Sequence, residues 1–335
     1  MVLRKYAMAE QFPLDLQLFA DVTNVTTQDS MSVEMKTFYD KNLLENAEPE
    51  LVHDQWAQTR DIPKNGGKKI EFRKFSQLPK ALTALTEGVT PEGQEISVSN
   101  MEAEVKQYGG YVKVSDILQM TTYDNVIVET TDMIGSQAGR TLDTISREVM
   151  NAGTNVQYAE GQVSSRATLT KDHKLTVKAV KMAVRMLEKQ HAKKIKGYYI
   201  GIIHPDIAFD LTEDERWIEA HKYAKPEELF NGEIGMIAGV RFVKTTEAKI
   251  FAKAGASGID VYSTLILGAN AYATTKIEGG GLETIIKQLG SAGTADPLNQ
   301  RATIGWKATK VTEILSQEYM VRIETGSTFS DGVAN

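Results

Sequence analysis

Residues that could do chemistry are few in this sequence, and their spacing selects no reaction. The histidines are His53, His173, His191, His204 and His221. No two of them stand four residues apart, as the histidine pair of a helical zinc motif would. His204 precedes Pro205 at the end of a predicted strand, where we expect a structural hydrogen bond rather than catalysis. The chain contains no cysteine, which excludes disulfides, thiolate metal sites and cysteine nucleophiles.

Two further patterns are equally weak as chemical signatures. The GEIG segment at 232–235 is similar to a phosphate-binding loop, but such a loop follows a strand and opens a helix. Here the segment precedes a predicted strand at 240–244. The acidic residues at 213–215 and 227–228 stand where helices are expected to begin, and acidic side chains stabilise a helix N-terminus. A glycosidase-like carboxylate pair stays open, but we expect no catalytic, cofactor-binding or metal site.

The composition is that of an ordinary globular protein. Of 335 residues, 41% are hydrophobic and 24% are charged, which provides a sizeable core and corresponds to about two domains. The formal net charge of −6 disfavours a dedicated nucleic-acid reader, because such proteins carry a basic excess. No apolar run is long enough to span a membrane. Polar residues interrupt the first 20 positions, so no secretory signal is expected.

The longest predicted helix covers residues 124–152. Its apolar stripe consists of Ile127, Ile134, Ala138, Leu142, Ile145 and Val149. Asp124 is the expected N-cap and Gly153 the expected stop. About 26 residues at 1.5 Å each form a rod of about 39 Å, which is long for a compact domain. Gly135 and Gly139 are expected to allow close packing against it.

A second amphipathic helix is predicted over residues 174–190. Its basic stripe consists of Lys174, Lys178, Lys181, Arg185 and Lys189. This stripe is either a solvated helix face or a contact for nucleic-acid phosphate, and no aromatic residue stands in it to stack on bases. Strands are predicted around 198–203, 240–244 and 259–267, so residues 173–287 read as an α/β or α+β domain.

A long hairpin is predicted between residues 60 and 114. Residues 69–73 (KIEFR) alternate polar and apolar with the period of a half-buried strand. On the return strand the apolar residues change from even-numbered to odd-numbered positions near Ser99 and Asn100. One extra residue would cause this change, so a bulge is predicted there. Phe75–Glu95 lies between, and a loop of about 20 residues without periodicity is typical of a functional or partner-contacting loop.

Charge is segregated along this hairpin. The basic side consists of Lys64, Lys68, Lys69, Arg73, Lys74 and Lys80, and the acidic side of Glu87, Glu92, Glu95, Glu102 and Glu104. Two interpretations stay open: the charges pair within one hairpin, or they meet the charges of a neighbouring subunit.

Residues 1–50 are too weakly apolar to form a core of their own. They are either a flexible tail or an arm that orders against another subunit. Leu14, Leu16, Leu18 and Phe19 favour the arm, because a cluster of exposed apolar side chains is costly in water.

Five segments together carry a resemblance to a known family. They are LQLFA at 16–20, LTEGVTPEG at 85–93, GEIG at 232–235 continuing to GVRF at 239–242, PLNQRATIGWK at 297–307 and YMVRIE at 319–324. Each is weak alone, but their order and spacing over nearly the whole chain resemble the major capsid proteins of tailed bacteriophages and their prophages. The branch typified by the phage N4 major capsid protein is the most similar.

The resemblance implies an α+β fold of the tailed-phage major capsid type. It implies an N-terminal arm at 1–50, an extended hairpin loop at 51–114 and an axial domain at 173–287. A peripheral domain with a long spine helix then comprises residues 115–172 and 288–335.

The resemblance also implies a structural protein rather than an enzyme. Its subunits are expected to form pentamers and hexamers that tile an icosahedral shell around double-stranded DNA, in the host cytoplasm during assembly and then in the virion capsid. Further expected partners are scaffold, portal or decoration proteins, with non-specific contact to the enclosed DNA, no membrane and no cofactor. The residues expected at subunit contacts are Leu16, Leu18, Phe19, Lys68, Lys69, Arg73, Leu85, Glu87 and Val89.

Some relatives join subunits through a Lys–Asn isopeptide bond, but no lysine, asparagine and glutamate here can be matched to such a site. Two alternatives remain. One is a cellular nanocompartment shell that encloses a cargo enzyme, and the other is a soluble α/β enzyme with a carboxylate site.

Overall fold

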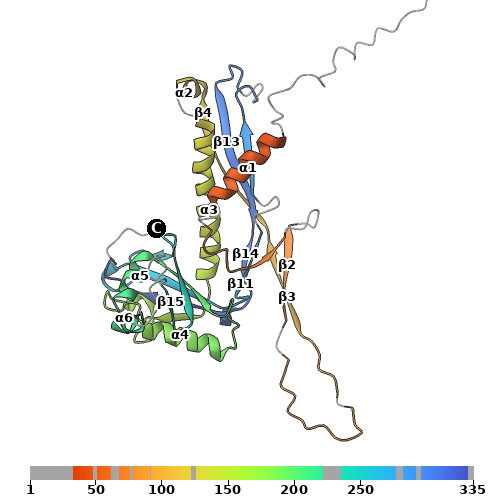
Figure 1. Ribbon diagram of the computed structural model, residues 1–335, viewed down its shortest axis with the longest axis vertical. Helices are drawn as coiled ribbons and strands as arrows, with labels where there is room; N and C mark the ends of the chain where they lie inside the picture. Colours follow the sequence, from red (N-terminus) through yellow and green to blue (C-terminus); the bar gives the residue numbers. More distant parts are fainter. Residues whose placement is uncertain are drawn as a thin grey trace, which may run out of the picture.

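The computed structural model describes residues 33–47, 51–61, 68–75, 78–90, 92–121, 126–221, 235–276, 282–291 and 296–330. Three parts are visible in Figure 1: an elongated part built on one long helix, a compact body, and a narrow two-stranded ribbon. The α-helices are α1 (Val33–Ala47), α2 (Asp116–Thr121), α3 (Val126–Asn151), α4 (Val177–Lys189), α5 (Pro205–Thr212) and α6 (Glu215–His221).

The elongated part packs α3 against an antiparallel sheet. The sheet order is β12 (Leu282–Lys287), β13 (Arg301–Lys310), β4 (Lys106–Ser115). The predicted apolar stripe of α3 is confirmed, since Ile134, Ala138 and Leu142 are buried against Ile304 and Trp306 of β13. The indole of Trp306 also donates a hydrogen bond to the Gln137 side chain at 3.2 Å. The expected N-cap Asp124 lies outside the described residues.

α1 crosses α3 at the glycine that the sequence marks for close packing. A Cβ atom at Gly135 would lie 2.9 Å from the Asn46 Cβ and 3.2 Å from the Leu43 carbonyl oxygen. Polar contacts fix the same crossing, because Asn42 and Asn46 donate to Asp132 at 2.6 and 3.1 Å. The close packing of α1 on α3 therefore requires a residue without a side chain at this point of α3.

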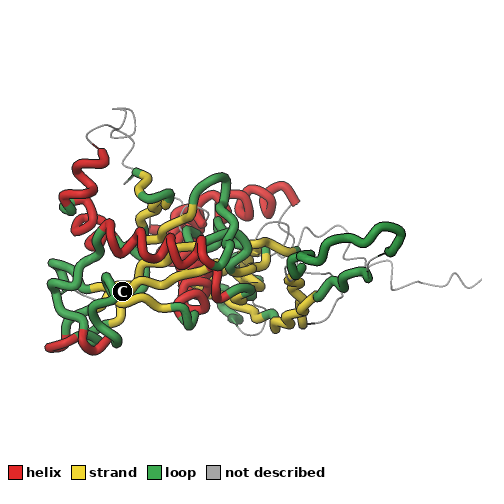
Figure 2. The backbone as a smooth tube through the Cα atoms, turned by 90° about the horizontal axis from the view of Figure 1, so that it is seen from below, coloured by secondary structure: helices red, strands yellow, loops and turns green. Residues whose placement is uncertain are grey.

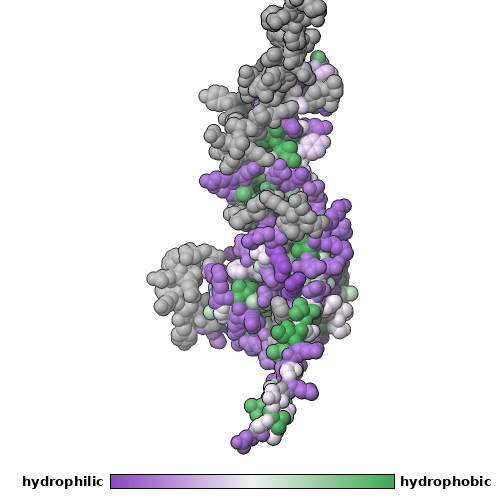
Figure 3. Space-filling view, turned by 90° about the vertical axis from the view of Figure 1, so that its right-hand side faces the viewer, coloured by the Kyte–Doolittle hydropathy of each residue, from purple (hydrophilic) through white to green (hydrophobic). Residues whose placement is uncertain are grey.

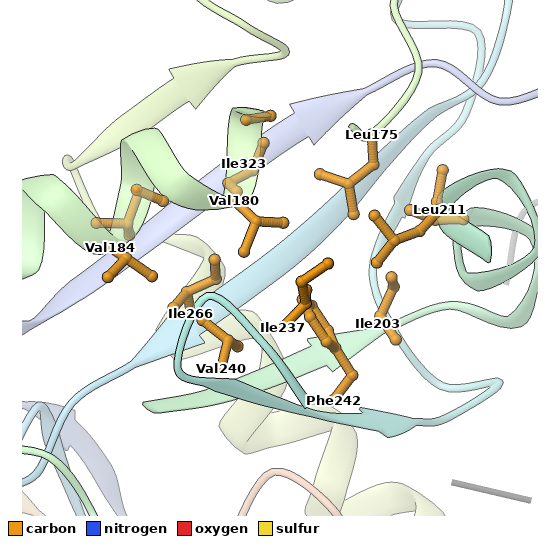
Figure 4. Close-up of a cluster of buried hydrophobic side chains, with 14 of the residues drawn as sticks. Leu175, Val180, Val184, Ile203, Leu211, Ile237, Val240, Phe242, Ile266 and Ile323 are labelled. Atoms are coloured by element: carbon orange, nitrogen blue, oxygen red, sulfur yellow. The ribbon is translucent and has the colours of Figure 1, made fainter. Parts of the chain in front are cut away.

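The compact body is a seven-stranded mixed sheet with helices packed on it. The path runs β5 (Val156–Tyr158), β15 (Met320–Thr325), β10 (Val261–Leu267), β6 (Tyr199–Ile203), β8 (Val240–Lys244) and β7 (Met236–Ile237), and β9 (Ile250–Phe251) pairs with β10. α4 places Val180 and Val184 over one sheet face, where they meet Ile266 and Ile323 (Figure 4). Figure 2 shows the same body end-on, with its helices around the strands.

A small sheet connects the elongated part, the body and the ribbon. It pairs β1 (Gln58–Arg60), β11 (Tyr272–Thr275) and β14 (Thr312–Ile314). The ribbon itself is β2 (Lys69–Phe75) and β3 (Val98–Glu104), paired antiparallel. Short 3-10 helices cover Arg166–Thr168, Ala256–Gly258 and Gln317–Tyr319.

The predicted bulge near Ser99 and Asn100 is wrong. The ribbon register is continuous from the pair Lys69–Glu104 to the pair Phe75–Val98. The two even positions that suggested the bulge, Ile96 and Val98, are both exposed, Ile96 in the loop before β3. The inward side of β3 is the odd one, where Met101 and Ala103 pack in the ribbon base.

Strand pairing also differs from the expected division of the chain at two points. β4 belongs to the sheet under α3 and not to the hairpin, and β15 pairs with β10 in the body rather than with the elongated part. Hydrogen bonds between strands define these memberships, and a sequence pattern of alternation cannot tell which strand is the partner. The division into arm, hairpin, peripheral and axial domains stays a proposal.

Substituting Gly135→Ala tests the crossing of α1 over α3. Alanine stabilises a helix by about 1 kcal/mol relative to glycine, but here its methyl group meets backbone and Cβ atoms of α1. Because overpacking costs about 1–3 kcal/mol, we expect the free energy of unfolding to fall. The measurement is denaturant unfolding. Met133→Ala, at an exposed α3 position, is the control and should change stability by less than about 0.5 kcal/mol.

Candidate assembly surface

The ribbon is fixed at its base and free at its tip. Ile70, Phe72 and Ala103 are buried against Ala273 of β11 and Leu315, which holds the β2–β3 pair on the small connecting sheet. Beyond Phe75 the described loop residues are all exposed. Figures 1 and 3 both show this loop projecting away from the rest of the molecule.

The projecting loop carries apolar side chains that this subunit leaves in water. The exposed fractions are 85% for Leu82, 78% for Leu85, 63% for Val89 and 69% for Ile96. They form the apolar patches at the lower end of Figure 3. A turn orders the tip, since the Val89 amide donates to the Thr86 carbonyl at 3.1 Å around Gly88, whose φ is +78°. A loop with its own internal order and exposed leucines is suited to contact another surface.

The charges of the ribbon pair only in part. The Lys69 ammonium contacts the Glu102 carboxylate at 2.7 Å, with both side chains exposed. This hydrogen bond raises the pKa of Lys69 and lowers the pKa of Glu102. Lys68 and Arg73 are exposed, and within the described part of the chain neither has an ion-pair partner. Pairing inside the hairpin therefore accounts for Lys69 but leaves other charges available.

The predicted contact residues fall into two groups. Lys68, Lys69 and Arg73 lie at the ribbon base, and Leu85, Glu87 and Val89 lie together at the tip, all exposed. Leu16, Leu18 and Phe19 of the expected arm lie outside the described residues. The role of each of these residues at a subunit contact stays a prediction.

A second exposed surface complements the loop. We call it the basic sheet face: the side chains of β4, β13 and β12 that point away from α3. Its exposed cations are Lys113, Lys287, Arg301 and Lys307, its apolar members are Tyr111 and Ile285, and its acid is Glu283. Strand register brings these together, because Tyr111 and Ile285 both pair with Gly305. By contrast, the loop from 81 to 97 contains Glu87, Glu92 and Glu95 and no cation.

A buried polar cluster joins residues 53–54 to α3 and the β11, β13 and β14 strands, and the sequence analysis missed it. The His53 ring contacts the Asp143 carboxylate at 2.6 Å, and both side chains are fully buried. The same carboxylate accepts from the His53 backbone amide at 2.7 Å. The Tyr272 hydroxyl donates to the His53 carbonyl oxygen, and burial raises the pKa of that phenol well above its ordinary value.

Lys310 is the charged centre of the same cluster. Its ammonium contacts the Asp54 carboxylate and donates to the Leu142 carbonyl of α3 at 2.7 Å. Ser146 of α3 donates to Asp54 at 2.5 Å and shares a hydrogen bond with Thr312 of β14 at 2.8 Å. Residues 53–54, α3 and the β13–β14 strands are thereby joined at one point. Asp54 and Lys310 are 256 positions apart, so no local sequence signal could have indicated this pair.

Two other candidates for chemistry, His204 and Asp214, have structural roles, while the acidic residues at 227–228 and residues 232–234 of the GEIG segment lie outside the described residues. The Nδ1 atom of His204 accepts a hydrogen bond from the Asp206 amide at 3.2 Å and caps α5, as predicted. Asp214 accepts from the Val177 amide at 2.9 Å at the start of α4. Within the described ranges, no group of three or more His, Asp and Glu side chains could hold a metal ion. Among the helices described, none is long and apolar enough to cross a membrane.

Several solved phage capsid subunits have a similar arrangement of parts. The capsid of Ralstonia phage GP4 matches with a TM-score of 0.64 at 14% identity, covering 82% of this chain and 86% of that one. The cyanophage Pam1 capsid matches with a TM-score of 0.65 at 15% identity, over 84% and 92%. The head of Helicobacter pylori bacteriophage KHP40 gives 0.60 at 10% identity, over 92% and 97%. The fold is therefore the α+β fold of tailed-phage capsid proteins.

The family follows from the sequence itself. Residues 19–288 match the family model described as phage capsid protein. This match spans most of the 335 residues, so the chain belongs to the phage capsid protein family and is a structural protein of bacteriophages. No curated protein matches the chain.

Substituting Asp54→Ala tests the buried cluster. Removing one partner of a buried ion pair leaves an uncompensated charge, which costs about 3–5 kcal/mol. We therefore expect a loss of unfolding free energy of that size for D54A, measured by denaturant unfolding. The control is Asp61→Ala, which removes an exposed carboxylate 3.4 Å from Lys276 and should cost less than about 1 kcal/mol. Equal effects of the two substitutions would contradict this role of Asp54.

Proposed function

We propose that this capsid protein assembles with copies of itself, through pentamers and hexamers, into an icosahedral phage head that encloses double-stranded DNA. The observation that carries the proposal is the projecting loop, whose leucine and valine side chains no part of the described subunit covers. Burying one such side chain contributes about 1.5–3 kcal/mol. Every subunit of a closed shell repeats the contact, so individually modest contacts add up to a stable particle.

The basic sheet face of a neighbouring subunit is the proposed receiving surface for the loop. Lys113 and Lys287 flank Thr303 on adjacent strands, and Tyr111 with Ile285 offers an apolar strip beside them. The loop carries the acidic residues Glu87, Glu92 and Glu95 and exposed apolar side chains, which complement the cations and the apolar strip of this face. Charge complementarity of this kind sets the register of a contact and disfavours wrong partners.

The proposal includes the other partners and the location implied by the fold. Of the expected arm at 1–50, α1 packs on α3 of its own subunit, so the proposed contact with a neighbouring subunit is confined to the residues before α1. A separate scaffold, portal or decoration protein completes the head. The protein acts without catalysis, in the host cytoplasm during assembly and in the virion afterwards. A nanocompartment shell would use the same contacts, so the discriminating measurement is the content of purified particles: nucleic acid, or a cargo enzyme. A monodisperse monomer with measurable turnover would instead favour a soluble enzyme.

The triple substitution L82S/L85S/V89S tests the apolar contact of the loop. Because these side chains are exposed in the single subunit, the variant should fold with unchanged stability but form at least tenfold fewer closed particles. Particles are counted by negative-stain electron microscopy, and the fold is checked by circular dichroism and unfolding. The control T83S/T86S/T90S changes the same loop but removes only one methyl group per residue and keeps every leucine and valine, so it should assemble normally. Normal particles from both variants would show that the loop is dispensable.

A charge exchange tests the proposed receiving surface. The variant E87K/E92K places cations on the loop opposite the cations of the neighbour, and we expect assembly to fail at low salt. Adding K113E/K287E to the same chain restores opposite charges across the contact and should recover particles. The combination of E87K/E92K with K106E/K244E, which changes exposed lysines elsewhere, is the control and should not recover them. Equal recovery by both combinations would rule out this surface as the specific partner.

A further inference from the structure

The solvent side of α4 carries a row of cations on an otherwise acidic protein. Lys178, Lys181, Arg185 and Lys189 are exposed, while Val180, Val184 and Leu187 face the core of the body. We call these four residues the α4 basic stripe. Their spacings of three, four and four residues place them on one side of the helix. The helix forms one side of the compact body in Figure 1.

The stripe continues into the loop that follows the helix. Lys193, Lys194 and Lys196 are exposed there. The loop is tied back to the helix end by the Ala192 amide, which donates to the Leu187 carbonyl at 3.0 Å. From Lys178 to Lys189 the helix rises about 16 Å, so the cations form an extended row rather than a point.

Acidic groups neutralise only the two ends of this row. Glu160 contacts Lys178 at 2.7 Å, and Glu188 contacts Lys194 at 3.5 Å. Glu318 borders a groove of about 440 Å³ together with Lys189. Lys181 and Arg185, in the middle, have no ion-pair partner among the described residues. A solvated helix face usually mixes both signs of charge, because neighbouring i, i+4 pairs stabilise a helix. Here the acidic residue within α4 is Glu188 near its C-terminal end, and Lys178, Lys181 and Arg185 have no acid between them.

Building on the proposed function, we propose that the α4 basic stripe faces the interior of the head and binds the phosphate backbone of the enclosed duplex DNA. Duplex DNA presents one negative charge per about 1.7 Å of axis, so a row of about 16 Å meets several phosphates. The stripe contains no aromatic side chain, and phosphate contacts carry no sequence information. Binding is therefore independent of sequence, as a shell around a whole genome requires.

The triple substitution K181Q/R185Q/K189Q tests this contact in the full-length protein. The probe is a fluorescent duplex of random sequence, titrated at several salt concentrations and followed by anisotropy. Each lost phosphate contact lowers the slope of log K against log[salt] by about 0.9. We therefore expect the slope to fall by about 2–3 and affinity at low salt to fall at least tenfold. The control K106Q/K244Q/K253Q removes the same charge from exposed lysines elsewhere and should keep the slope nearly unchanged.

Electron microscopy of the same variants separates this proposal from the proposed function. If wild-type chains form no particles, the shell itself is wrong. If the stripe variant forms particles and keeps the wild-type salt slope, the shell stands and the DNA contact is wrong. A polyglutamate peptide serves as a second probe: if the variant loses binding to it but keeps the duplex slope, the stripe recognises an acidic protein and the proposal fails.

Discussion

The buried ion pair between Lys310 and Asp54 is the contact on which the shape of the subunit depends. Lys310 ends the long strand β13, Asp54 precedes the ribbon, and the Leu142 carbonyl that shares the ammonium belongs to the middle of α3. Replacing such a pair with apolar residues is often neutral for the free energy of unfolding. The pair matters for geometry instead, because the directed contacts of a charge with its partners fix the relative positions of the elements that carry them. The pair joins the segment before the ribbon to α3 and β13, and Ile70, Phe72 and Ala103 hold the ribbon base on the connecting sheet, so that the loop can project into water.

Local patterns in the sequence predict much of this architecture. The α3 stripe, the Gly135 crossing and the alternation of β2 follow from periods of 3.6 and 2, and the exposed loop follows from a long segment without either period. The Gly135 prediction is confirmed because glycine destabilises the interior of a helix. A glycine at such a position therefore indicates that another segment packs closely against it. The change from even to odd apolar positions near Ser99 was misread, because Ile96 and Val98 are exposed and an apolar residue type does not by itself show that the side chain is buried.

Long-range pairing is what the sequence could not provide. His53 with Asp143 and Asp54 with Lys310 join positions 90 and 256 residues apart, and no spacing rule connects them. The basic sheet face was missed for the same reason: Lys113, Lys287 and Lys307 stand on three strands, and only the register of β4, β12 and β13 gathers them. The exposure of the loop residues could be predicted because they are contiguous in the chain, and their role at a subunit contact stays a prediction.

The position of β15 in the body sheet has a consequence for synthesis. This strand, residues 320–325, lies between β5 and β10, so β5 at 156–158 can join the sheet only after residues 320–325 have been synthesised. The ribbon and the loop precede β15 in the chain and are synthesised before the body sheet can be completed. Protein chains generally fold from the N-terminus during translation, and here β5 must wait for a strand that follows it by more than 150 residues.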